Sequence, residues 1–167
     1  MVIDIGCAEG YYAVGFARLL PNATVYAYDT DIEAQHFCRD LARRNDVLDR
    51  IHIRGFCDHA QLASLTASPV FILSDCEGFE LEQFEPQKIP GLKHATMLIE
   101  LHEFLSPGLT ATLMSRFEKT HHITLIDTQE RDPNKYEVLQ PVLEADRIFA
   151  VREGRPAAMQ WAFMKPM

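Results

Sequence analysis

The chain has 167 residues, of which 47% are hydrophobic, and this is enough apolar material for one compact domain with a sizeable core. Its 16 basic and 24 acidic residues give a formal net charge of −8, so its overall field would repel a phosphate backbone. The composition therefore predicts a single domain over residues 1–167 and argues against a nucleic acid as its partner.

Cysteine usage and hydropathy narrow the class of protein further. The four cysteines are scattered singly with no C-x-x-C pair, which argues against a zinc site and against a disulfide framework. No apolar run approaches the length of a membrane span, and no basic segment precedes an apolar stretch at the start. We therefore expect a soluble cytoplasmic protein without a membrane partner.

The chain begins with a short apolar strand, Val2–Ile5, that runs into a loop of small residues. A helix is predicted over Tyr11–Leu20 and a second strand over Thr24–Tyr28, so Asp29 stands at the carboxyl end of that strand. Backbone amides at a helix N-terminus suit an anionic group, and the Asp29 carboxylate can accept hydrogen bonds from both hydroxyls of a ribose. This layout is typical of a nucleoside-binding crevice.

The loop after the first strand differs from a dinucleotide-binding fingerprint. Gly6, Ala8 and Gly10 remove side-chain bulk where backbone must approach a ligand. A G-x-G-x-x-G loop would carry glycine where this chain has Ala8 and Tyr11, so a nicotinamide-dependent oxidoreductase is disfavoured. The pattern that is present, D-x-G-x-A-x-G starting at Asp4, resembles the first motif of class I S-adenosylmethionine-dependent methyltransferases.

The later elements alternate between helices and strands, which predicts a doubly wound α/β sheet with mostly parallel strands. The predicted strands are Ile51–Arg54, Val70–Leu73, Thr96–Leu101, His122–Ile126 and Gln160–Met164, and the predicted helices are Ile32–Arg44, Leu109–Lys119 and Ala145–Glu153. Gly154 and Pro156 break the chain before the last strand. Four residues of the first of these helices fall on or near one apolar face: Ile32, His36, Phe37 and Leu41.

Two later segments extend the resemblance. Ser74–Glu82 contains a D-x-E-G-x-E-x-E pattern similar to that of FkbM-type methyltransferases, and Ile99–His102 contains the E-L-H that follows in that family. The resemblance implies a seven-stranded Rossmann-like sheet whose last strand lies antiparallel beside the fifth. It also implies S-adenosylmethionine as cofactor, with Asp4 and the loop amides holding its methionine part and Asp29 its ribose.

Members of this family usually carry a segment upstream of the first strand. Because the first strand here begins at Val2, we expect a minimal version that lacks the usual N-terminal extension. Two interpretations follow: a methyltransferase, or a non-catalytic cofactor-binding or assembly module with the same fold.

Acidic residues and a histidine follow the predicted fourth and fifth strands. Methyl transfer to a hydroxyl needs a base, and Asp75, Glu77 and His102 are the candidates. Histidine fits best by its ordinary pKa, although a lone histidine after a strand is often a packing residue. Glu77 and Glu80 have the alternative role of interacting favourably with a helix dipole.

A metal site formed by Asp75, Glu100 and His102 is chemically reasonable, but no dense ligand spacing supports it, so we expect no metal.

Four further interpretations concern the ligands and the surface. Asp58 is expected either to accept from the adenine amino group or to cap the following helix. The absence of an N/D-P-P-Y/F/W segment after the fourth strand favours an oxygen acceptor on a small molecule or sugar. Tyr11, Tyr12 and Phe79 either line the acceptor pocket or pack on the sheet. The segment Thr128–Glu144 is a lid, a partner surface or an ordinary long connection; the sequence does not indicate an oligomeric state.

Overall fold

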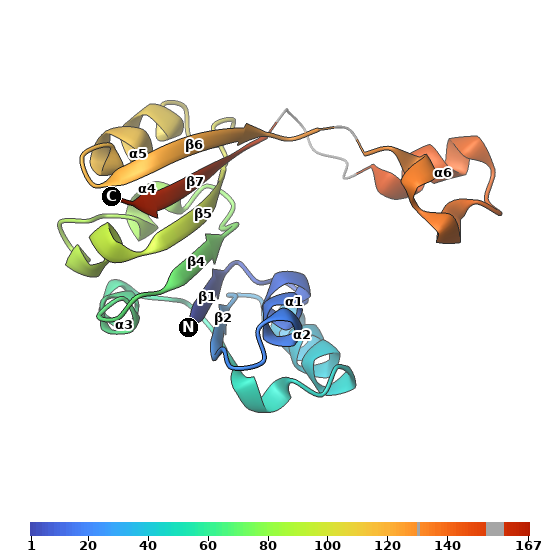
Figure 1. The fold of residues 1–167 in the computed structure, drawn as a ribbon, viewed down its shortest axis with the longest axis horizontal. Coiled ribbons are helices and arrows are strands. Elements are labelled where there is room, and N and C mark those ends of the chain that lie inside the picture. Colours follow the sequence, from blue (N-terminus) through green and yellow to red (C-terminus); the bar gives the residue numbers. More distant parts are fainter. Residues whose placement is uncertain (130, 153–158) are drawn as a thin grey trace.

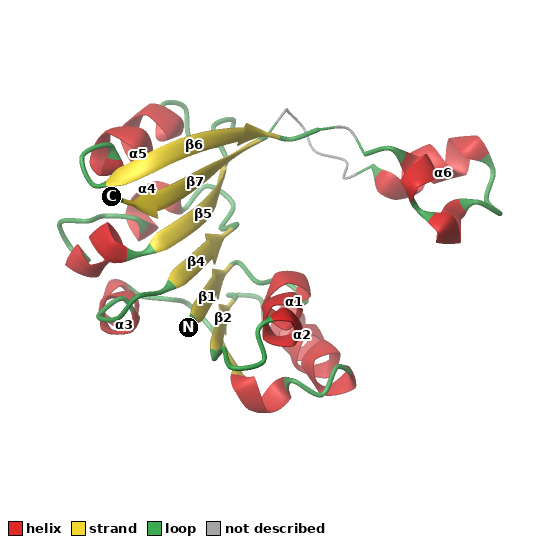
Figure 2. Cartoon of the chain, viewed as in Figure 1, coloured by secondary structure: helices red, strands yellow, loops and turns green. Residues whose placement is uncertain are grey.

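The computed structural model describes residues 1–129, 131–152 and 159–167. Its centre is one seven-stranded sheet with the strand order β3-β2-β1-β4-β5-β7-β6 (Figures 1 and 2). The strands are β1 Val2–Ile5, β2 Val25–Tyr28, β3 Ile51–Arg54, β4 Phe71–Ser74, β5 Thr96–Leu101, β6 His121–Asp127 and β7 Gln160–Pro166. Strands β1 to β5 pair in parallel, whereas β7 lies antiparallel between β5 and β6. The expected doubly wound sheet and its antiparallel last strand are both confirmed.

The described residues form six α-helices, and all but the last lie on the two faces of the sheet, as Figure 1 shows. They are α1 Tyr11–Leu19, α2 Ile32–Arg44, α3 His59–Leu65, α4 Glu80–Gln83, α5 Leu109–Phe117 and α6 Glu144–Val151. The predicted helix and strand bounds agree with the observed ones within two residues. No helix in the described part of the chain is both long and apolar enough to cross a bilayer.

The core consists of two apolar layers, one on each face of the sheet. Successive strand residues point to opposite faces, so Val2 joins one layer and Ile3 the other. The layer under α1 and α2 is built from small side chains such as Ala13, Ala17 and Ala42. The opposite layer contains the larger side chains Leu62 of α3, Phe84, and Leu109, Leu113 and Phe117 of α5. Burial on both faces explains why the central strands are short apolar runs.

The predicted apolar face of α2 is not its buried face. Cys38 and Ala42 are the buried residues of this helix, whereas Ile32 and Phe37 are 69% and 53% exposed. His36 is also exposed, and Leu41 is half-buried. The helix approaches the β1 loop closely, so only small side chains fit at the contact. The larger apolar residues were therefore a misleading guide to orientation.

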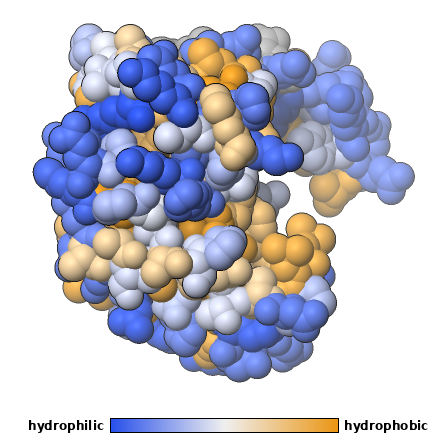
Figure 3. Space-filling view, turned by 60° about the vertical axis from the view of Figure 1, so that its left-hand side comes forward, coloured by the Kyte–Doolittle hydropathy of each residue, from blue (hydrophilic) through white to orange (hydrophobic). Residues whose placement is uncertain are grey.

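The segment between β6 and β7 projects away from the sheet (Figure 1). It contains two short 3₁₀ turns, Pro133–Lys135 and Glu137–Leu139, followed by α6. Residue 153 of the predicted helix lies outside the described residues, as do Gly154 and Pro156. Figure 3 shows hydrophobic side chains beside a hollow between this projecting segment and the rest of the domain.

Candidate active site

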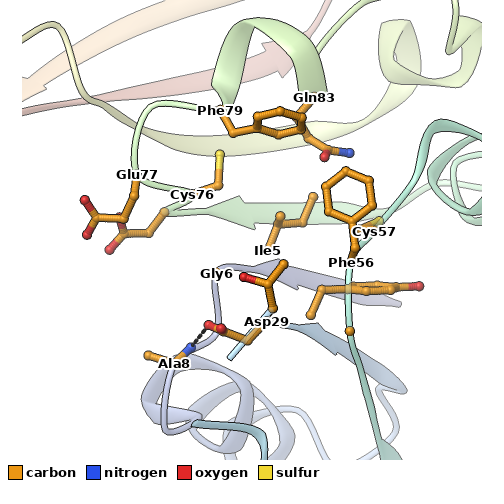
Figure 4. A pocket seen from close by; sticks show the side chains of 14 residues that line it. Ile5, Gly6, Ala8, Asp29, Phe56, Cys57, Cys76, Glu77, Phe79 and Gln83 are labelled. Atoms are coloured by element: carbon orange, nitrogen blue, oxygen red, sulfur yellow. Dashed lines mark hydrogen bonds between the residues drawn. The ribbon is translucent and has the colours of Figure 1, made fainter. Parts of the chain in front are cut away.

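A cleft of about 410 Å³ opens at the carboxyl ends of the central strands. Its walls come from the loops after β1, β2, β3 and β4, between residues 5 and 83 (Figure 4). The strand order reverses between β1 and β4, and ligands of open parallel sheets bind outside the strand ends at such a point. The volume lies within the range of small-molecule sites, about 300–1,000 Å³.

The loop after β1 has three residues in the left-handed region, with φ of +79° at Gly6, +44° at Ala8 and +89° at Gly10. A Cβ on Gly6 would lie 1.8 Å from the carbonyl oxygen of Asp75, and one on Gly10 would lie 2.5 Å from Cys38 Sγ. Both glycines are therefore required by contacts within the protein, which differs from the expectation that they make room for a ligand. Gly6 and Ala8 also line the cleft, whereas Gly10 does not.

Asp29 joins the end of β2 to this loop. Its Oδ2 accepts a hydrogen bond from the Ala8 backbone N–H at 2.8 Å, drawn dashed in Figure 4, and its Oδ1 accepts from the Asp31 N–H at 2.8 Å. The side chain is half-buried and lines the cleft. The structure thus brings together the two elements from which the nucleoside site was predicted, with open space beside them.

Asp4 lies beneath the loop and not on the wall of the cleft. It is fully buried, and neither carboxylate oxygen has a hydrogen-bond partner among the described residues. Burial raises the pKa of Asp4 to about 7, and the charges of Asp75 and Asp29 act in the same direction. The Ala13 backbone N–H lowers the pKa of Asp4, but by less than burial raises it. Direct contact between Asp4 and a cofactor would therefore require movement of the loop.

Asp58 serves as the N-cap of α3. Its side chain accepts from the Gln61 N–H at 2.8 Å, so the capping interpretation is confirmed. Asp58 itself does not line the cleft, although its neighbour Cys57 does. Its contact with an adenine stays a prediction.

Two aromatic rings form the wall opposite Glu77 (Figure 4). The rings of Phe56 and Phe79 meet edge to face with their centroids 5.7 Å apart, and the residues are 53% and 39% exposed. Phe79 was predicted for a pocket, but Phe56 was missed; its position directly after β3, beside Gly55, was the available signal. Tyr11 and Tyr12 do not line the cleft, because they pack against each other, and Tyr12 also packs against Trp161.

The three predicted catalytic residues come together beside the cleft. Nε2 of His102 lies 3.4 Å from Asp75 Oδ1 and 3.7 Å from Glu77 Oε2. Asp75 and Glu77 line the cleft, whereas the His102 side chain is only 3% exposed and lies behind them. Glu100 Oε2 is also 3.7 Å from Nε2. The loop after β4 and the end of β5 thus place three carboxylates around one imidazole nitrogen.

Glu80 holds the other side of the ring. His102 Nδ1–H donates to Glu80 Oε1 at 2.6 Å, and Glu80 is fully buried. This role was not predicted, because α4 is a single short turn whose buried face depends on the whole fold. Burial lowers the pKa of His102, but the hydrogen bond and charge of Glu80, together with Asp75 and Glu77, outweigh it and raise the net pKa. The expectation that His102 has the ordinary pKa of a histidine is therefore wrong.

Comparison with known proteins places this geometry in a fold class. No protein-family model and no curated protein matches the chain. Among solved structures, a precorrin-6y C5,15-methyltransferase from Geobacter metallireducens is similar with a TM-score of 0.64 and 14% identity over 98% of this chain and 79% of that one. A putative O-methyltransferase from Klebsiella pneumoniae has a TM-score of 0.60 and 15% identity, over 98% and 72% of the two chains.

An rRNA methylase from Streptococcus thermophilus has a TM-score of 0.59 and 12% identity, over 98% of this chain and 86% of that one. The chain spans 35% of another similar protein, WbdD. At these identities the likeness concerns the fold alone. The chain has the fold of class I S-adenosylmethionine-dependent methyltransferases, with its cleft at the strand ends.

Proposed function

We propose that the protein is an S-adenosylmethionine-dependent methyltransferase of FkbM type that methylates an oxygen of a small molecule or sugar. The observation that carries this proposal is the hydrogen bond between the Ala8 N–H and Asp29, at the edge of a cleft that continues to Asp75 and Glu77. A carboxylate fixed in this way still has lone pairs for the two hydroxyls of a ribose. The free thiols of all four cysteines fit a reducing compartment, and we infer a cytoplasmic location.

The proposed binding mode follows the walls of the cleft. The loop after β1 receives the methionine part, Asp29 the ribose, and Phe56 and Phe79 the adenine between apolar surfaces. The bound cofactor supplies an electrophilic methyl group on a sulfonium. The residues of this chain align the acceptor and receive its proton, because methyl transfer is a displacement that needs an aligned nucleophile.

Asp75, Glu77 and His102 form the proposed proton-accepting group. Asp75 and Glu77 reach the cleft, and His102 lies behind them at 3.4 and 3.7 Å. A carboxylate at the cleft can hold the acceptor hydroxyl, while the buried imidazole stores the proton. The net charge of −8 favours a small hydroxylated acceptor over an RNA.

Calorimetric titration with S-adenosylmethionine and with its demethylated product tests the cofactor assignment. We expect saturable binding of both, weakened at least tenfold by Asp29→Ala. Asp40→Ala is the matched control, because it also removes a carboxylate but lies on the exposed side of α2, paired with Arg43. Binding of neither compound, or preferential binding of NAD, would overturn the proposal.

Transfer of a radiolabelled methyl group to a panel of sugars, phenols and RNA tests the acceptor. The non-catalytic module is the alternative, and it predicts cofactor binding without transfer to any of them. Transfer to RNA alone would refute the oxygen acceptor on a small molecule.

A further inference from the structure

The carboxylate oxygens of Asp75 and Glu77 lie farther from Nε2 of His102 than hydrogen-bond partners do. The distances of 3.4 Å from Nε2 to Asp75 Oδ1 and 3.7 Å to Glu77 Oε2 exceed the usual hydrogen-bond range of about 2.7–3.2 Å. One ligand atom from each of these three residues lies within 4.8 Å of the other two. Two atoms that bind one metal ion at about 2.1 Å in a tetrahedral arrangement are about 3.4 Å apart. The two distances from Nε2 are close to this value, so the nitrogen and each carboxylate are spaced as ligands of a shared cation would be.

The orientation of the histidine is a second and independent observation. Glu80 accepts the Nδ1 proton at 2.6 Å, and both side chains are almost completely buried. In the neutral ring with its proton on Nδ1, Nε2 has a lone pair that faces Asp75 and Glu77. A carboxylate that fixes the far nitrogen in this way is the usual outer partner of a histidine that binds a metal.

The charges around the ring also favour a cation. Asp75 Oδ1 is buried, and no hydrogen bond to it is present in the described part of the chain. Carboxylates of Asp75, Glu77, Glu80 and Glu100 surround a single imidazole. Glu80 and Glu100 are buried and Asp75 is largely so, and carboxylates held close together with little solvent repel one another. A divalent ion beside them would reduce that repulsion.

We propose that Asp75, Glu77 and His102 bind a divalent first-row transition-metal ion, such as Mn²⁺ or Zn²⁺, at the wall of the cleft. This revises the sequence-based expectation of no metal. An imidazole nitrogen with two carboxylates suits these ions better than Mg²⁺ or Ca²⁺, which prefer oxygen ligands alone. Three protein ligands leave coordination positions open toward the cleft, where a water or an acceptor hydroxyl can bind and lose its proton more readily. In the metal-bound chain the ion therefore takes over the role proposed above for the His102 imidazole.

Titration of the chelator-treated full chain with Co²⁺, followed by visible absorption, tests this site. We expect one saturable equivalent with the bands of a protein-bound ion, displaced by Zn²⁺ and not by Mg²⁺. Glu77→Gln should weaken Co²⁺ binding at least tenfold, and because the Glu77 side chain is 78% exposed the variant should fold normally. Glu80→Gln keeps an oxygen acceptor for Nδ1 but loses the charge, and should weaken binding about 10- to 100-fold.

Glu82→Gln is the matched control, since Glu82 is an exposed carboxylate on the same short helix as Glu80. Absence of saturable Co²⁺ binding, binding that the Glu77 and Glu80 variants leave unchanged, or equal competition by Mg²⁺ would overturn the proposal. Titration of S-adenosylmethionine on the same samples separates the two proposals. Cofactor binding without metal binding refutes only the metal site, and metal binding without cofactor binding refutes only the methyltransferase.

Discussion

The backbone of Gly6 lies against the backbone of Asp75, so that a Cβ on Gly6 would stand 1.8 Å from the Asp75 carbonyl oxygen. The loop after β1 and the loop after β4 are thus in direct contact, although they are far apart in the sequence. The loop proposed to bind the cofactor and the carboxylates of Asp75 and Glu77 are consequently neighbours. Because the two backbones are in contact, a displacement of either loop should shift the other.

Gly6→Ala should damage both halves of the site. The substitution places a methyl group in steric conflict with the carbonyl oxygen of Asp75. It also requires alanine to adopt φ +79°, and this backbone conformation by itself costs about 1–2 kcal/mol. We expect a loss of stability above that figure in denaturant unfolding, together with loss of cofactor binding. Gly15→Ala is the control, because that position in α1 has open space around it and should gain up to about 1 kcal/mol. Equal stability of the Gly6 variant and the wild type would contradict the contact.

Asp4 gives the fold a defined pH dependence. Its pKa rises from 3.8 to about 7 on burial, so between these pH values the folded chain holds a proton that the unfolded chain has lost. Stability therefore decreases as the pH rises through this window, by at most about 4 kcal/mol, and stays low above it. Asp4→Asn should flatten this slope in thermal unfolding and raise the melting temperature at pH 8 by about 2–4 °C per kcal/mol regained.

Asp40→Asn, at an exposed position, should leave the Asp4-dependent slope unchanged. If Asp4→Asn kept the slope of the wild type, the pH dependence would have to come from other groups.

The aromatic wall should contribute to nucleoside affinity. Phe56→Ala and Phe79→Ala each remove an apolar surface on which adenine can lie, at a cost of about 1–3 kcal/mol per stacked base. Calorimetry with adenosine and with S-adenosylmethionine measures this loss. Phe37→Ala is the control, because Phe37 on α2 is as exposed as Phe56, at 53%, and does not line the cleft. An equal effect of the Phe37 and Phe56 variants on affinity would show that the two rings do not bind the nucleoside.

Arg116 should keep α4 in place. It donates to the carbonyl oxygens of Leu81 and Phe84 at 2.5 and 3.0 Å and forms an ion pair with Glu85 at 3.2 Å. Arg116→Ala leaves two carbonyls without a partner, at about 1–3 kcal/mol in stability. Hydrogen exchange over residues 80–85 should accelerate, since these amides depend on α4.

The matched control is Arg43→Ala, whose ion pair with Asp40 is exposed and contributes about 0–1 kcal/mol. Unchanged exchange in α4 of the Arg116 variant would show that the helix is held by other contacts.

The sequence predicted those parts of the site that follow from the strand order. Asp29 and the β1 loop had to meet, because parallel strands bring their carboxyl ends to one edge of the sheet. Asp75 and His102 met for the same reason, at the ends of β4 and β5. The sheet itself was predictable because its strands are short apolar runs separated by helical patterns.

Features decided by packing could not be predicted in the same way. The buried face of α2 is set by Cys38, which fits against Gly10, and no periodic pattern identifies a contact between two small residues. Glu80 is charged, as solvent-facing helix residues usually are, but the fold buries it in a hydrogen bond with His102. Phe56 lines the cleft only because β3 ends where it does.

The two ends of the projecting segment meet at the sheet. Asp127 and Gln160 are paired across β6 and β7, and the Thr128 N–H donates to the Met159 carbonyl at 3.0 Å. A two-residue hairpin turn could therefore join these strands directly. The stretch between them is not needed for the pairing of β6 with β7, and none of its described residues contributes to the wall of the cleft, so a shorter connection should leave both the sheet and the cleft intact.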